Sequence, residues 1–150
     1  MIQSLIKKLP LILILVLFLI SCGKKSPPYL PKSRLPFRVI VPKAEKENGI
    51  WTIKGEVAGK IGKRGFRPSD ITGCIIYYSK YSLKNPPCES CPLYYGESRI
   101  IEAKVVKDGH FSVKLPWIKK KGIYYLRIRL TGINNSIGPP SDRVRIEIKE

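Results

Sequence analysis

Residues 123–130 read IYYLRIRL, and this stretch decides the fold. Leucine, isoleucine and the first tyrosine alternate with tyrosine and arginine, so an extended strand would have one apolar face and one aromatic, basic face. Residues 143–149, RVRIEIK, repeat the alternation near the end of the chain. If the apolar side chains of both segments enter a core, the outward residues include Tyr125, Arg127, Arg129, Arg143 and Arg145.

The period of two continues toward the N-terminus and predicts further strands at residues 37–41, 51–57, 71–78, 99–106 and 110–115. Asn48-Gly49 marks a turn after the first of these, and Asp108-Gly109 is a strong hairpin signal between the last two. No amphipathic helical repeat of useful length interrupts the pattern. About seven short strands in roughly 110 residues are typical of an all-β, immunoglobulin-like antiparallel β-sandwich.

The last third of the chain has a recognisable order. Leu115 is followed by a turn, Tyr124 opens the alternating run, and a loop of asparagine, glycine, proline and serine leads to the final strand. This order resembles the end of a fibronectin type III domain. The resemblance implies that Tyr124 is a corner tyrosine, with a buried ring and a hydroxyl bonded to the backbone. It also implies an inward tryptophan in the second strand, but Gly55 stands there, so we expect Trp51 or Trp117 to fill the space.

The N-terminal part carries an export signal. Two lysines precede an apolar run that ends in Leu19-Ile20-Ser21-Cys22, an order typical of a secretory signal peptide. The run is shorter than the about 20 apolar residues that a membrane-spanning helix needs. The tetrad resembles the lipobox of bacterial lipoproteins, in which the cysteine receives a diacylglycerol, the peptide is cut before it and the new amino terminus is acylated, for example with palmitate. An ordinary cleaved signal with a chance cysteine is the alternative.

We therefore divide the chain into a cleaved signal peptide (residues 1–21), a lipidated tether (22–36) and a fibronectin type III-like sandwich (37–149). Three prolines and two lysines lie in the ten residues from Cys22, which favours an extended tether. This start resembles that of small proteobacterial lipoproteins, one of which assists maturation of the lipopolysaccharide translocon. Gly23, rather than aspartate, follows the cysteine. Under the sorting rule of enteric bacteria, that implies the outer membrane, facing the periplasm.

The mature protein is strongly basic. The formal net charge of +17 falls to +15 because Lys7 and Lys8 leave with the signal peptide and no acidic residue does. Such a charge is typical of nucleic-acid binding, but export argues against that partner. In the cell envelope the available polyanions are anionic lipid and lipopolysaccharide, and an envelope protein is a further possible partner. Lysines spread over a solvated surface are the alternative explanation.

Cys88 and Cys91 form a C-x-x-C motif in a proline-containing loop. The motif leaves a redox dithiol, half of a zinc site and a disulfide that pins the loop as interpretations. Redox catalysis would need a feature that lowers a thiol pKa, such as a helix N-terminus, and zinc would need two further ligands. In an exported protein we expect the disulfide, with Cys74 as a small apolar core residue.

The sequence predicts no enzyme active site. The glycine-rich basic loop at residues 59–65 lacks the phosphate-loop motif, the single histidine lies in a tight turn, and the acidic residues are scattered. We expect no catalytic residue, metal or cofactor. The leading hypothesis is a binding module that uses the outward arginines with Tyr125 and Tyr77. The alternatives are an envelope assembly helper and a thiol- or metal-dependent factor that uses Cys88 and Cys91.

Replacement Cys22→Ser should release the mature protein from membranes, because it removes the thiol that accepts the lipid. Each buried methylene of an acyl chain contributes about 0.8 kcal/mol to membrane binding, so several chains should hold the unsubstituted protein in membranes even in high salt. Fractionation measures the distribution, and mass spectrometry should find the acyl chains on Cys22. A Cys22→Ser protein that stays with membranes in high salt would contradict the lipid anchor.

Overall fold

The computed structural model describes residues 34–59, 67–88 and 91–149. The predicted signal peptide, Cys22, most of the tether and most of the glycine-rich loop lie outside the described residues. The described residues all belong to one compact unit, Pro31–Glu150. None of the helical turns within them is long and apolar enough to cross a membrane.

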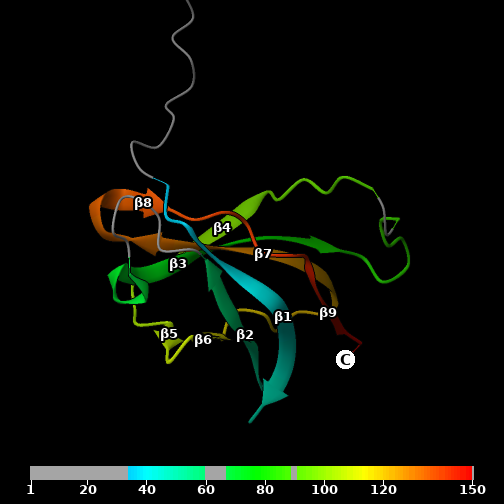
Figure 1. Cartoon of the computed structure of the whole chain (residues 1–150). Helices are drawn as coiled ribbons and strands as arrows, with labels where there is room; N and C mark the ends of the chain where they lie inside the picture. Colours follow the sequence, from blue (N-terminus) through cyan, green and yellow to red (C-terminus); the bar gives the residue numbers. More distant parts are fainter. Residues whose placement is uncertain (1–33, 60–66, 89–90, 150) are drawn as a thin grey trace, which may run out of the picture. The chain divides into compact units, whose positions relative to one another are not determined.

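Nine strands of the described residues form two antiparallel sheets (Figure 1). The first sheet has the order β1-β2-β6-β5, with bounds Phe37–Glu47, Ile50–Gly59, His110–Leu115 and Val106–Lys107. The second has the order β4-β3-β7-β8, with bounds Glu97–Ile101, Ile71–Tyr81, Gly122–Gly132 and Ser136–Ile137, and β9 (Val144–Ile148) also pairs with β7. This order confirms the predicted immunoglobulin-like, fibronectin type III-like β-sandwich.

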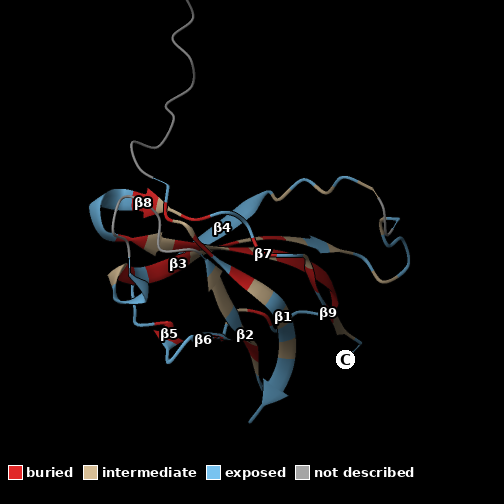
Figure 2. Cartoon of the chain, viewed as in Figure 1, coloured by how far each residue is buried: buried red, intermediate tan, exposed pale blue. Residues whose placement is uncertain are grey.

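The core lies between the sheets and is built from the inward residues of each strand (Figure 2). Leu126, Ile128 and Leu130 of β7 are completely buried, and they belong to the same core as Ile53 and Leu115 of the first sheet. The arginines between them lie on the opposite face of β7 and are half-buried. The alternation in residues 123–130 therefore predicts correctly which side chains enter the core.

The predicted strand at residues 99–106 is wrong. β4 pairs with β3 in one sheet and β5 pairs with β6 in the other, so the chain crosses between the sheets at residues 102–105. Val105 and Val106 are both buried, and successive residues of a regular strand cannot share one face. The turn at Asp108-Gly109 is confirmed, and both residues have positive φ, at 51° and 79°, as a two-residue hairpin turn of this type requires.

The sandwich begins before residue 37, where the tether was expected to end. Leu35 is completely buried, and its N–H donates to the carbonyl of Ile137 at 3.2 Å. Arg34 forms an isolated parallel bridge with the same residue. The last residues of the predicted tether therefore belong to the domain, because an apolar side chain there can reach the core.

A close approach of β1 to β2 explains why Gly55 replaces the expected tryptophan. A Cβ atom at this position would lie 2.8 Å from Cγ1 of Val39 and 3.0 Å from the carbonyl oxygen of Ile40. No large side chain fits such a space, and glycine permits the close contact. Trp51 and Trp117 are both half-buried and pack against the core, so both contribute to filling it.

Tyr124 forms a tyrosine corner, the geometry in which a buried tyrosine hydroxyl bonds to the backbone upstream of its strand. Its hydroxyl donates to the carbonyl of Lys120 at 2.9 Å, and the residue is 4% exposed. Burial raises the pKa of this hydroxyl. The bond ties the β6–β7 connection to the first turn of residues in β7.

Replacement Tyr124→Phe should lower the free energy of unfolding by about 1 kcal/mol, because it removes this hydrogen bond and keeps the ring. Tyr94→Phe is the matched control: Tyr94 is 83% exposed, and its replacement should change stability by less than about 0.5 kcal/mol. Urea unfolding of both variants measures the difference. Equal effects would show that the hydroxyl bond contributes nothing.

Candidate functional site

The outer face of the second sheet carries the residues that the sequence predicts to bind a partner. The pairing of β3 with β7 places Tyr77 opposite Arg127 and Ile75 opposite Arg129. The pairing of β7 with β9 places Tyr125 opposite Arg145, and Arg143 directly precedes β9. The structure thus brings together a set that we call the basic face: Tyr77, Tyr125, Arg127, Arg129, Arg143 and Arg145.

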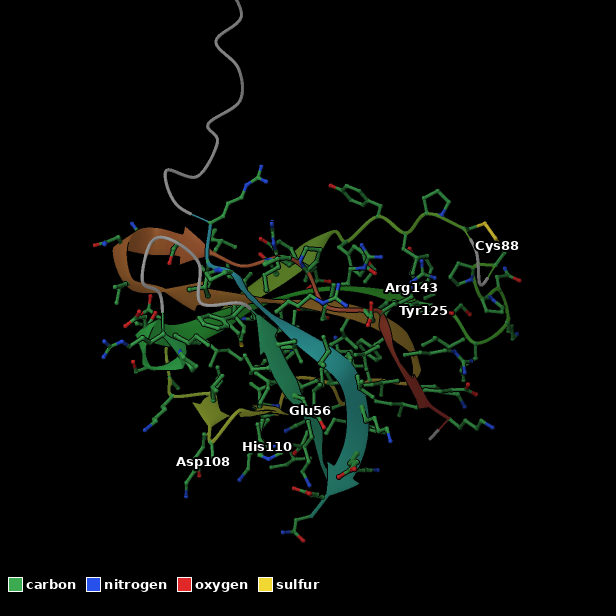
Figure 3. All side chains as sticks on the ribbon, viewed as in Figure 1. Glu56, Cys88, Asp108, His110, Tyr125 and Arg143 are labelled. Carbon is green, nitrogen blue, oxygen red and sulfur yellow. A yellow bond between two sulfur atoms is a disulfide. The ribbon has the colours of Figure 1, made fainter. Side chains whose placement is uncertain are left out.

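Tyr125 is only 5% exposed, so the prediction of an open outward position is wrong for this residue. Its ring lies edge-on to that of Tyr81, with 5.8 Å between centroids, and Cζ of Arg143 lies 5.7 Å from its centroid (Figure 3). The loop at residues 82–96 returns over this part of the sheet, and Arg143 Nη2 donates to the carbonyl of Cys91 at 3.2 Å. The sequence pattern of β7 alone could not reveal this cover.

The same loop contacts β3 and β7. The hydroxyl of Ser79 donates to the carbonyl of Tyr94 and accepts from the N–H of Gly96 at 3.2 Å. Cζ of Arg127 lies 5.8 Å from the ring centroid of Tyr95, within cation–π range. Nε of Arg127 and the hydroxyl of Tyr95 are buried without a hydrogen-bond partner among the described residues. Such burial costs about 1–3 kcal/mol per group, so Arg127 stands here at some cost in stability.

The arginines of the basic face differ in how their charge is compensated. Arg129 Nε donates to the carbonyl of Gly138 at 2.9 Å, whereas Arg145 forms an ion pair with Glu147 at 2.5 Å. Within residues 34–59, 67–88 and 91–149, neither Arg127 nor Arg129 forms an ion pair. Uncompensated positive charge is therefore concentrated on β7.

The cysteines of the domain have two different environments. The structure places a disulfide between Cys88 and Cys91, in the loop that covers Tyr125, and Cys74 is a free thiol in the core. Burial raises the pKa of Cys74 to about 12, so almost none of it is thiolate at neutral pH. Among the described residues, no three histidine, cysteine, aspartate or glutamate side chains gather as metal ligands.

A hollow beside β1, β2 and β6 is a feature that the sequence did not predict. Its volume is about 390 Å³, and its lining includes Val41, Gly55, Glu56 and His110. Glu56 and His110 lie opposite each other on neighbouring strands (Figure 3), but no hydrogen bond joins them in the described structure, so they do not form a catalytic pair. The hollow lies where the β1–β2 register shifts and Val41 has a φ of 46°, a local irregularity that alternation does not encode.

Two solved structures resemble the chain. The third fibronectin III domain of the human KIAA0343 protein has a TM-score of 0.49 at 14% identity, over 87% of this chain and 94% of that domain. A protein described as a myokine has a TM-score of 0.35 at 14% identity, over 81% of this chain and all of that one. No family model and no curated protein matches the sequence. The fold assignment therefore rests on the strand order and the core.

Peptide mapping without reduction should recover Cys88 joined to Cys91 and Cys74 as a free thiol. Because burial raises the pKa of Cys74, an alkylating reagent at pH 8 should modify it slowly in the folded protein and rapidly after denaturation. A disulfide between Cys74 and either loop cysteine would contradict this assignment. Stoichiometric zinc in the purified protein would support the metal-dependent alternative instead.

Proposed function

We propose that this protein is a lipid-anchored cell-envelope protein whose β-sandwich is a non-catalytic binding module for an anionic ligand. The lipobox-like tetrad ending at Cys22 supports the anchor, and Gly23 favours the outer membrane. The anchored domain would face the periplasm, where nucleic acid is not an available partner. Its ligands there are anionic lipid, lipopolysaccharide or an acidic envelope protein, which share phosphate or carboxylate groups.

The observation that carries the proposal is the position of Arg127 and Arg129 on one face of β7. Side chains two residues apart in a strand point the same way and are separated by about 7 Å. Both guanidinium groups lie beside half-buried apolar or aromatic neighbours, Ile75 and Tyr77, on β3. Neither arginine has an acidic partner in the described part of the chain. Two such groups can bind phosphate or carboxylate through paired N–H donors.

The contacts of these arginines favour a defined site over a diffuse charge. The backbone carbonyl of Gly138 accepts from Nε of Arg129, and the ring of Tyr95 lies against Arg127. Both contacts restrict the side chains without neutralising them. A restricted arginine loses less conformational entropy when it binds than a free lysine does. The anchor would add to the affinity, because it holds the domain next to an anionic surface.

Removing the two charges of β7 should weaken binding to anionic vesicles by about thirtyfold, because each basic residue near an anionic leaflet contributes about 1 kcal/mol. We suggest Arg127→Gln with Arg129→Gln in a soluble form that begins at Gly23, with binding measured by vesicle sedimentation at low and high salt. Lipopolysaccharide in place of the vesicles distinguishes the two anionic sources. High salt should release the unsubstituted protein, because the screening length is about 8 Å at physiological ionic strength.

Lys107→Gln with Lys114→Gln is the matched control, because both lysines are exposed on the first sheet and the net charge changes equally. We expect this pair to cost less than about threefold in affinity. Arg127→Lys with Arg129→Lys keeps the charge and should retain most of the binding. Thermal unfolding of each variant excludes misfolding as the cause. Equal losses in the glutamine pairs would mean that only net charge matters and that the basic face is not a site.

A further inference from the structure

Strand β4 forms an open edge of the second sheet. It pairs with β3 on one side, and no described strand pairs with its other side. Its first four residues are exposed (Figure 2). The main-chain N–H and C=O groups of an unpaired edge can pair with another strand. This edge is independent of the charge on the basic face.

The two most exposed large hydrophobic residues of the described chain flank this edge. Tyr94 is 83% exposed and Ile100 is 66% exposed. Cε1 of Tyr94 lies 3.5 Å from the point where a Cβ of Gly96 would stand, so the ring occupies the space beside that glycine. Gly96 and Ile100 are four residues apart, and positions four apart along a strand share a face. One partner strand could therefore cover both side chains.

We propose that the β4 edge binds the β4 edge of a second copy of this chain, in an antiparallel pair related by a two-fold axis at Ser98. The charges select this register. An axis at Ser98 places Glu97 opposite Arg99 of the second copy, twice by symmetry. An axis at Arg99 would instead place the two arginines against each other, which is unfavourable. Glu97 already accepts a hydrogen bond from the hydroxyl of Tyr78 at 2.6 Å, so its carboxylate is oriented at the edge.

The apolar residues favour the same register. With the axis at Ser98, Ile100 lies opposite Gly96 of the second copy, where the absence of a side chain leaves room. The isoleucine would then pack on the ring of Tyr94 that lies beside this glycine. The symmetric pair covers both exposed side chains of each copy and forms two ion pairs. No foreign strand is needed to satisfy this edge.

The pair has a consequence for ligand binding. A two-fold axis that relates antiparallel strands is perpendicular to the sheet, so the second sheets of both copies join and their outer faces point the same way. The two basic faces would then meet one anionic surface together. Two sites that engage the same surface bind more tightly than either alone. The pairing itself does not depend on what the basic face binds.

Cross-linking of the full-length chain in detergent tests the register. In the proposed pair, the Cα atoms of Ser98 in the two copies are about 4.5–5.5 Å apart, which a disulfide can bridge. The Cα atoms of Ile100 in the two copies are about 13 Å apart, four residues along the strands. Oxidation with diamide should therefore give at least about fivefold more covalent dimer for Ser98→Cys than for Ile100→Cys, with the new bond located by mass spectrometry. Equal yields, or no dimer from either variant, would overturn the proposal.

Charge substitution provides a second, independent measurement. Arg99→Glu places two carboxylates opposite each other and should weaken self-association by about tenfold in sedimentation velocity. Glu97→Arg combined with Arg99→Glu restores opposite charges and should recover the dimer. Val41→Glu is the control, because Val41 is an exposed hydrophobic residue of the first sheet, and its dimer should be unchanged. A protein that is monomeric throughout, or whose dimer ignores Arg99→Glu, would refute the β4 pair.

Discussion

The structure depends on the burial of one face of β7. This strand pairs with β3, β8 and β9, and its inward residues Leu126, Ile128 and Leu130 are completely buried. Burying each such side chain contributes about 1.5–3 kcal/mol. A register shift by one residue would move Arg127 and Arg129 into the core, at a cost that no other contact offsets. The apolar side therefore determines where the basic side must lie.

Keeping the arginines out of the core does not place them in free solvent. The loop at residues 82–96 lies over part of the outer sheet, and its carbonyl and aromatic groups contact Arg143 and Arg127. The disulfide between Cys88 and Cys91 shortens the freedom of this loop. The result is a partly desolvated cationic surface with restricted side chains. Such a surface is better suited to recognising an anion than a set of mobile lysines.

Two ends of the sandwich show how local irregularities shape its surface. At the β1–β2 pair, the register shift and the missing side chain of Gly55 open a hollow lined by Glu56 and His110. At the other sheet, β4 ends the strand order and leaves an exposed edge that carries both charges and hydrophobic residues. Edges of this kind are usually protected. Here the alternating Glu97 and Arg99 make the edge complementary to itself.

The sequence by itself determined the fold class, because the period-two pattern in residues 123–130 and the neighbouring segments can bury only one face of each strand. It also determined which residues lie inside and which arginines share the opposite face. The tertiary structure alone decided that residues 99–106 divide between two sheets, that Leu35 joins the core and that Tyr125 is covered. Those outcomes depend on contacts between segments far apart in the chain, such as Arg143 with Cys91. Alternation reports the face of a residue and not what another segment places over that face.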